Sequence, residues 1–262
     1  MRNYLVSALL PCGLFAAACA SPACAQNAGV DIAKAQQTVT EIARLLDGIA
    51  ARNAGVARNI VGGSGSVMAP SDAESLFDGV SLGGWKKTDF RGGGAVHVEP
   101  GFRGGPSAIV VDAGTSLSGI TWTKDMPRTN YEISLESMKI EGLDFMCGLT
   151  FPVAASHASL ILGGWGGNVV GISSLDDHDA SENETTQGMP FAKDHWYKVR
   201  MRVTPAKLEA WLDDKKIVDV SIAGKKVSLR FGEISKSTPL GLATYQTKAA
   251  YRNIKLHRLA AK

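Results

Sequence analysis

Two adjoining segments carry most of the side chains that could do chemistry. The first, Gly163–Asn168, surrounds Trp165 with four glycines. Glycines lose much backbone entropy on folding and add no side-chain packing, so this run is a poor core strand. The second segment holds five carboxylates within nine residues, with His178 and Asn183 between them: Asp176, Asp177, Asp179, Glu182 and Glu184. Together, the two segments predict sugar binding, metal binding or acid–base chemistry. The alternative is that they form a glycine-rich turn followed by a solvated acidic loop.

Acid–base chemistry would use Glu182 and Glu184, with His178 as an electrophilic partner. In an extended stretch, residues 182 and 184 share one face. Two like charges held close together raise one of their pKa values, which suits a general acid or base. Hydrolysis of a glycoside by the usual route needs two such carboxyl groups roughly 5 to 10 Å apart. We therefore take these three residues as the catalytic candidates.

Binding without chemistry would use the ring of Trp165 as a platform for a sugar. Asn168, Asp176 and Asn183 would then supply hydrogen bonds. The alternative for Trp165 is a buried core position. Three other tryptophans lie in strand-like runs and are expected in the core: Trp122, Trp196 and Trp211.

Metal binding is the third possibility for the acidic segment. Carboxylate oxygens are hard donors that suit calcium, and Asp177 and Asp179 are the candidate ligands. The spacing does not fit an EF-hand, and the five histidines are scattered without paired spacing, which disfavours zinc. Calcium is thus the candidate divalent cation at this segment.

The N-terminal residues resemble a secretory signal peptide. Arg2 precedes an apolar run from Leu5 to Ala18, and Ala23-Cys24-Ala25 fits the rule for cleavage before Gln26. This predicts a signal peptide over 1–25 and export to the periplasm or the extracellular space. The apolar run is too short for a membrane span. A lipoprotein anchor at Cys19 is the weaker alternative, because Ala16 stands where leucine is usual.

The mature chain would keep one cysteine, Cys147, since the other three lie in the signal peptide. Its apolar, strand-like surroundings predict a buried structural thiol. The formal net charge of +3, with balanced signs, does not indicate the basic surface that binds nucleic acid, so no nucleic-acid partner is expected.

A short helical segment is predicted ahead of the main domain. Apolar residues recur over 30–52 at helical spacing, from Ile32 to Ile49, within a segment that we bound at 26–61. This amphipathic helix could pack on the main domain, lie on a membrane or self-associate with a second copy. Glycines and serines over 62–72 predict a flexible linker, and residues 73–262 the main domain.

The sequence pattern of the main domain predicts an all-β fold. Eleven strand-like runs are separated by turn signals, with no helical pattern between them: 108–112, 119–123, 131–140, 146–151, 158–162, 169–173, 196–204, 207–212, 216–222, 240–244 and 251–259. Such spacing predicts an antiparallel sandwich or barrel. Over 196–203 the residues alternate, which places Val199 in the core and Arg200 in water. Asp213 and Asp214 predict a hairpin turn.

Several short motifs, in order, resemble one known family. Ser75-Leu-Phe-Asp-Gly79 precedes Ser81-Leu-Gly-Gly-Trp85, and Tyr251-Arg-Asn-Ile254 closes the domain. Between them lie Trp196-Tyr-Lys-Val-Arg200, Glu209-Ala-Trp-Leu-Asp213 and Pro239-Leu-Gly-Leu242. Together these motifs, over about 75–259, are similar to those of the 3-keto-disaccharide hydrolase domain family.

The resemblance implies a concanavalin A-like jelly-roll β-sandwich, with the first and last strands side by side and with Phe77 and Trp85 in the core. It also implies action on 3-keto sugars. The chain departs from the family pattern where a Gln-x-His-Gly stretch is usual, since Tyr245 stands in place of the histidine and Gln246 follows it. Both are kept as substrate-binding candidates. In mid-domain only the terminal aspartate of another family stretch remains, as Asp176.

Two functions follow from these observations. The first is a carbohydrate-active hydrolase or lyase that acts on a 3-keto-glycoside or a related glycoside by general acid–base chemistry. The alternative is a non-catalytic, lectin-like carbohydrate-binding module on a helical tether. A structural protein that binds a partner through its N-terminal helix is a third possibility. In the first two cases the partner is a carbohydrate ligand.

Overall fold

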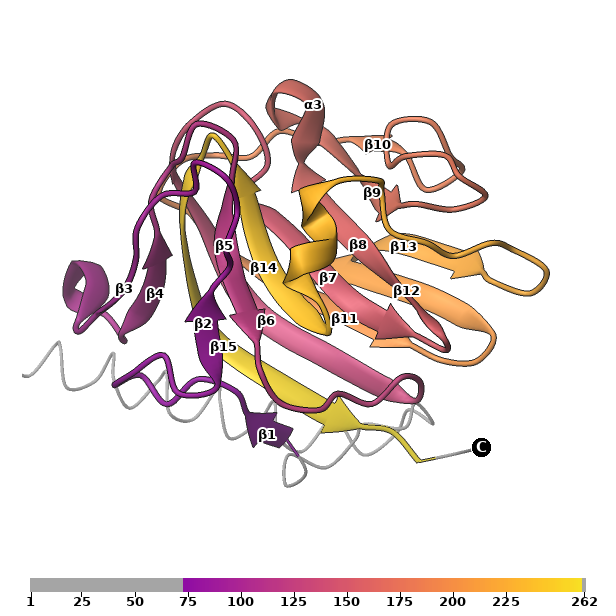
Figure 1. Cartoon of the computed structure of the whole chain (residues 1–262), viewed down its shortest axis with the longest axis horizontal. Helices are drawn as coiled ribbons and strands as arrows, with labels where there is room; N and C mark the ends of the chain where they lie inside the picture. The colour runs from indigo at the N-terminus through magenta and orange to yellow at the C-terminus, as the bar shows by residue number, and fades with distance from the viewer. Residues whose placement is uncertain (1–72, 261–262) are drawn as a thin grey trace, which may run out of the picture. The chain divides into compact units, whose positions relative to one another are not determined.

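The computed structural model describes residues 73–260, which form a sandwich of two antiparallel β-sheets (Figure 1). The predicted signal peptide (1–25), amphipathic helix (30–52) and linker (62–72) lie outside the described residues. In the part of the chain that is described, none of the helices has the length and apolar character that a membrane crossing requires.

One sheet has eight strands and contains both ends of the described chain. Seven of them form a continuous path, in the order β13 (Lys215–Ser221), β12 (Lys207–Leu212), β11 (Trp196–Val203), β6 (Tyr131–Glu141), β15 (Lys248–Arg258), β4 (Ala108–Val111) and β3 (Val96–Glu99). The eighth, β1 (Ala73–Ser75), pairs with the end of β15, so that Ala73 lies opposite His257. The predicted neighbouring first and last strands are confirmed.

The second sheet has seven strands and carries the site described below. Its order is β10 (Gln187–Gly188), β9 (Val169–Ser173), β8 (Ser156–Gly163), β7 (Cys147–Val153), β14 (Leu240–Tyr245), β5 (Leu117–Trp122) and β2 (Trp85–Lys87). Three short helical turns complete the fold: η1 (Phe102–Gly104), α3 (Gly164–Gly167) and η2 (Glu233–Ser237). All eleven predicted strands are present, while β1, β2, β3 and β10 are too short to show as periodic runs.

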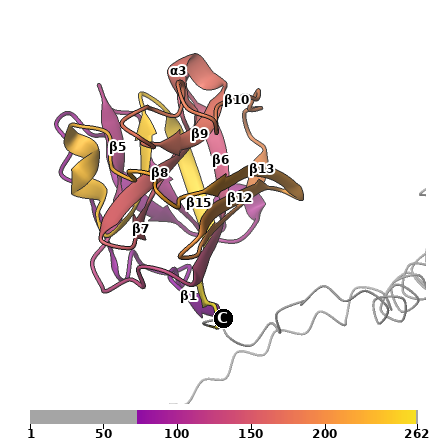
Figure 2. The ribbon, with the colours of Figure 1, turned by 90° about the vertical axis from the view of Figure 1, so that its right-hand side faces the viewer.

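The core lies between the sheets, and several strands alternate residues that face it with residues that face outward. In β8, for example, Leu160 and Leu162 are fully buried in the main cluster, while Ser159 and Ile161 lie on the outer face. Figure 2 shows the sandwich from the side, with α3 and β10 at the end opposite β1. The outer face of the seven-stranded sheet is therefore lined by residues that the core does not use.

The opening motif is structural, as predicted. Leu76, Phe77 and Trp85 are buried, and the indole N–H of Trp85 donates to the carbonyl of Leu76 at 2.8 Å. Asp78 closes the turn by accepting hydrogen bonds from the backbone N–H groups of Val80 and Ser81.

Two buried tyrosines donate hydrogen bonds across the core. The hydroxyl of Tyr251 donates to the carbonyl of Met146 at 2.6 Å, and that of Tyr131 donates to Pro152 at 2.6 Å. Cys147 is fully buried, and burial raises the pKa of its thiol to about 12. The predicted structural thiol is confirmed.

The three tryptophans expected in the core occupy different positions. Trp122 is buried between the sheets and packs against Trp85, with ring centroids 5.2 Å apart. Trp196 is half-buried in a small cluster on the outer face of the eight-stranded sheet, beside Phe102. Trp211 also lies on that outer face, where the guanidinium of Arg200 stacks 3.7 Å from its ring centroid. The core prediction is thus right for Trp122 and wrong for Trp196 and Trp211, which lie on the outer face. The neighbours of Trp211, Ala210 and Leu212, point inward instead.

Candidate functional site

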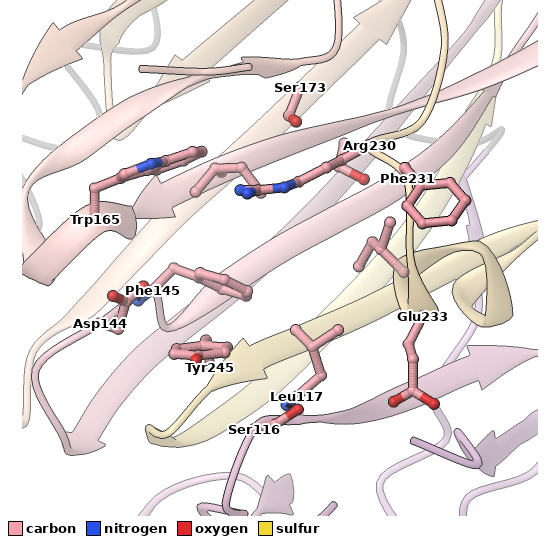
Figure 3. A pocket seen from close by; sticks show the side chains of 13 residues that line it. Ser116, Leu117, Asp144, Phe145, Trp165, Ser173, Arg230, Phe231, Glu233 and Tyr245 are labelled. Carbon is pink, nitrogen blue, oxygen red and sulfur yellow. Dashed lines mark hydrogen bonds between the residues drawn. The ribbon is translucent and has the colours of Figure 1, made fainter. Parts of the chain in front are cut away.

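A pocket of about 450 Å³ lies on the outer face of the seven-stranded sheet. Its floor is the outward side of the strands, including Leu117 of β5, Ser159 and Ile161 of β8, and Ser173 of β9. The other lining residues come from the end of β14, which gives Tyr245, and from loops and turns around this floor: Ser116, Asp144, Phe145, Trp165, Arg230, Phe231, Glu233 and Ile234 (Figure 3). The volume is in the range of small-molecule sites, roughly 300–1,000 Å³.

One side of the pocket is an aromatic wall made of Trp165, Phe145 and Tyr245 (Figure 3). The ring centroids of Phe145 and Tyr245 lie 6.2 Å apart, and the interplanar angle is 30°. Phe145 can lie against the sheet because Gly148 has no side chain there; a Cβ would come within 3.0 Å of the ring. Trp165 is 41% exposed and Tyr245 37% exposed, so both rings offer apolar surface to a ligand.

The glycines around Trp165 turn the chain so that the indole faces the pocket. Gly163, Gly166 and Gly167 all have positive φ, and Trp165 itself has φ 49°. This backbone favours glycine, and α3 is accordingly a single irregular turn. Asp144 holds the turn from outside, because its Oδ2 accepts the N–H of Gly166 at 3.0 Å.

The opposite side of the pocket is formed by residues 229–234, which we call the strap. At one end, Ser228 exchanges two backbone hydrogen bonds with Ser174, just beyond β9. At the other end the strap runs into η2, which lies over β14 and β5 (Figure 1). There the hydroxyl of Thr121 donates to the carbonyl of Lys236 at 3.0 Å, and Ser237 packs against Gly241.

Arg230 leaves the strap and reaches toward the aromatic wall (Figure 3). Its guanidinium carbon is 5.7 Å from the ring centroid of Trp165, and its Nη1 is 3.3 Å from Oδ2 of Asp179. Asp179 also accepts a hydrogen bond from the hydroxyl of Ser173 at 2.9 Å. The pocket thus combines an aromatic wall with a cation and several hydroxyls.

Two of the predicted site residues, Trp165 and Tyr245, line the pocket. Gln246 lies next to Tyr245, and its amide donates to the carbonyl of Thr115 at 3.0 Å. Asn168 follows the α3 turn and is exposed, and it is not part of the pocket lining.

The acidic segment 176–184 forms a separate loop, which we call the acidic loop, outside the pocket lining. Asp176 accepts the backbone N–H of Lys226, which with the Lys225 cation holds the pKa of its carboxyl below the usual value. Asp177 pairs with Lys226 and Glu184 with Lys225, each at 2.8 Å. Several of its carboxylates are thereby engaged in fixing this loop to residues 225 and 226.

Asn183 organises the acidic loop from within. Its Nδ2 lies within hydrogen-bond distance of the carbonyls of Ile172, His178 and Asp179, at 2.7 to 3.1 Å. Its Oδ1 accepts from the backbone N–H and the hydroxyl of Thr185. The amide is thus committed to backbone groups of its own loop. Glu182 and His178 have exposed side chains, and neither lines the pocket.

The described residues 73–260 contain no group of three or more His, Cys, Asp or Glu side chains placed to hold a metal ion. The two predicted calcium ligands have other partners, Lys226 for Asp177 and Arg230 for Asp179. Calcium binding stays a prediction.

Sequence reasoning missed the other lining residues, and four of them carry the aromatic wall, the strap or the turn that holds Trp165: Asp144, Phe145, Arg230 and Phe231. All four come from irregular segments between strands, where no periodicity marks them. The one available signal was Phe231, a large apolar residue next to Gly232 in a polar stretch, and it is fully exposed.

Comparison with protein families gives one match. The model of the family described as the 3-keto-alpha-glucoside-1,2-lyase-like domain matches residues 72–257. The resemblance inferred from the opening and closing motifs is confirmed. A search of curated proteins finds no match.

Solved structures with a similar fold include carbohydrate-related proteins. A Parabacteroides distasonis protein, provisionally described as a glycosyl hydrolase, is 17% identical, with 74% of this chain and 99% of that chain covered and a TM-score of 0.47. The carbohydrate-binding module CBM66 from Bacillus subtilis is 13% identical, with 66% and 95% covered and a TM-score of 0.44. Domain 4 of the arabinanase AbnA from Geobacillus stearothermophilus, in complex with arabinotriose, is 15% identical, with 73% and 93% covered and a TM-score of 0.48. At these identities the likeness concerns the fold alone.

Proposed function

Because the chain belongs to the 3-keto-alpha-glucoside-1,2-lyase-like domain family, we propose that its pocket binds a saccharide. The observation that carries this proposal is the pair of partly exposed rings, Trp165 and Tyr245, on one side of a small pocket. Sugar rings present C–H faces that pack on aromatic rings, while their hydroxyls need hydrogen-bond partners. Arg230 lines the same pocket and offers exposed N–H donors, while the hydroxyls of Ser159 and Ser173 bond to Thr150 and Asp179.

The geometry favours binding without cleavage as the primary function. The two carboxylates in the lining already have partners: Asp144 accepts two backbone N–H groups, and Glu233 accepts from Lys236 and from the backbone of Arg91. A general base must lie within hydrogen-bond reach of the proton that it removes. The sequence-based candidates Glu182, Glu184 and His178 belong to the acidic loop, outside the lining.

Cleavage of a 3-keto-glycoside is the second candidate, and family membership favours it. The ketone acidifies the neighbouring C–H, so a base can remove that proton and leave an enolate. The enolate then expels the glycosidic oxygen, and the leaving alcohol takes up a proton. Arg230 is the cation placed to stabilise such an enolate, while Glu182 or Glu184 would be the base.

Binding and product release, measured on the same purified protein, distinguish the two candidates. The ligands would be gluco-, xylo-, arabino- and fructo-oligosaccharides, 3-keto-glycosides and their unoxidised parents, with and without EDTA. We expect calorimetric binding that Trp165→Ala weakens by about tenfold or more, with no product release. Release from 3-keto substrates alone, lost in a Glu182→Gln, Glu184→Gln double variant, would establish the lyase. Loss of binding in EDTA would support the calcium prediction, and no binding to any ligand would refute the proposal.

A further inference from the structure

The pocket is a short groove that runs across the strands of the sheet. Its lining extends from Leu117 on β5 to Ser173 on β9, with β14, β7 and β8 between those strands. The aromatic wall bounds one side and the strap bounds the other (Figure 3). A polysaccharide could pass through such a groove only if both ends were open.

The end of the groove near β9 is crossed by Arg230. This side chain starts on the strap and ends beside the aromatic wall, with its guanidinium carbon 5.7 Å from the Trp165 centroid. Asp179 of the acidic loop fixes it from outside the groove, at 3.3 Å. A planar guanidinium can stack on an indole and pair with a carboxylate at once, which a lysine does less well.

Near β5, two hydrogen bonds hold the strap region to the loop that follows β2. The backbone N–H of Arg91 donates to Oε2 of Glu233 at 2.9 Å. The ammonium group of Lys236 donates to the carbonyl of Asp89 at 2.7 Å. The strap is therefore tied down at both ends of the groove, and it has a fixed position from which Arg230 can act.

We propose that Arg230 is an end stop, and that the pocket takes the terminal rings of a saccharide, not the middle of a long chain. This inference rests on the proposed saccharide binding. A volume of about 450 Å³ suits a short ligand. On the far side of Arg230 lies Asp179 of the acidic loop, whose carboxylate a longer saccharide would meet if the stop were removed.

The test is the dependence of affinity on chain length. The dissociation constant of the purified protein would be measured by calorimetry for two to six rings of each oligosaccharide series that binds. We expect the wild-type affinity to be the same for two and for six rings. In Arg230→Ala the six-ring ligand should bind at least about threefold more tightly than the two-ring ligand, a difference of about 0.65 kcal/mol.

The matched control is Arg103→Ala. Arg103 is also half-exposed, pairs with Asp194 and lies 5.3 Å from the ring of Phe102, but it is not in the pocket lining. This variant should keep the flat length profile of the wild type. Arg230→Ser serves as a second variant of the stop, and the ratio between ligands removes any general loss of affinity.

Two results would overturn the end stop while leaving saccharide binding intact. One is a wild-type affinity that rises steadily from two to six rings, a measurement that needs no variant. The other is an Arg230→Ala protein that binds with an unchanged, flat profile. Failure of every series to bind would instead refute the proposed function, and this inference with it.

Discussion

Asp144 and Gly166 are joined by a hydrogen bond from the glycine N–H to the carboxylate Oδ2, at 3.0 Å. The same carboxylate accepts the N–H of Phe145 through Oδ1, at 2.7 Å. One side chain thus connects the backbone of two residues that flank or form the aromatic wall. The orientation of Trp165 depends on this carboxylate, because α3 has few other hydrogen bonds to fix it.

Removal of this carboxylate should weaken ligand binding without unfolding the domain. We expect Asp144→Ala to lower saccharide affinity about tenfold, which corresponds to about 1.4 kcal/mol, because Trp165 would lose its fixed orientation. Asp144→Asn keeps one acceptor and should lose less. The control is Asp112→Ala, which removes an aspartate that pairs with Lys248 outside the pocket lining. Equal affinities of the alanine variant and the wild type, by calorimetry, would contradict the role of Asp144.

Substitution of Trp165 and of Trp211, which lie on the outer faces of different sheets, should affect saccharide affinity differently. Trp165→Ala should reduce saccharide affinity by about tenfold or more, since ring stacking and apolar burial are both lost. Trp211→Ala removes an indole from the other sheet, where Arg200 and Lys216 already cover the ring, and should leave affinity unchanged. Titrations of both variants with the same ligand test this, and a larger loss in Trp211→Ala would move the site to the eight-stranded sheet.

Asn183 should matter for stability more than the glutamates beside it. Asn183→Ala leaves the carbonyl of Ile172 without the side-chain amide that it accepts from at 2.7 Å. Loss of such a partly buried bond costs about 1–3 kcal/mol. Glu182→Gln changes an exposed side chain and should stay within about 0.5 kcal/mol of the wild type. Urea unfolding of the two variants measures the difference, and equal midpoints would show that the loop does not depend on Asn183.

Lys139 should be a source of instability at neutral pH. It is 7% exposed, and desolvation, together with the nearby Lys193 cation, lowers the pKa of its ammonium group, partly offset by Asp144. A lysine with a lowered pKa in the folded state disfavours folding while it is charged, and this cost disappears as the pH rises through the folded pKa toward 10.5. Lys139→Met should therefore stabilise the protein at pH 7 by about 0.5–2 kcal/mol.

The gain from Lys139→Met should shrink as the pH approaches 10.5, because the folded-state lysine is then largely neutral and the unfolded-state lysine is losing its proton as well. Thermal unfolding at pH 7 and at pH 10 measures this trend. Lys255→Met, at an exposed position, serves as the control and should change little at either pH. A gain that is the same at both pH values would mean that packing, and not the buried charge, causes it.

The strands could be predicted because alternation records which side faces the core. Val199, Met201 and Val203 are buried as the pattern of β11 predicts, and the motif with Phe77 and Trp85 packs as expected. The same alternation places Trp211 outside, since Ala210 and Leu212 point inward. The prediction for Trp211 was wrong because it relied on the large apolar side chain and not on the alternating position of the residue in β12.

The site was only partly predictable, because it is assembled from loops. Trp165 stood out because four glycines surround it, and Tyr245 because it replaces a residue of the family pattern. Arg230 and Asp144 are ordinary charged residues in sequence, and their positions depend on contacts with Asp179 and Gly166, which are distant in the chain. Of the two catalytic candidates, Glu184 pairs with Lys225 in the acidic loop and Glu182 is exposed there, and their catalytic role stays a prediction.

The pairing of β1 with the end of β15 brings Ala73 opposite His257. The described domain therefore enters and leaves at one corner, at the end away from α3 (Figures 1 and 2). A short peptide could join these two ends, and new termini could be opened in the exposed turn at Asp213 and Asp214, between β12 and β13. The domain should therefore tolerate circular permutation. It should also tolerate insertion into a loop of another protein, with its pocket directed outward.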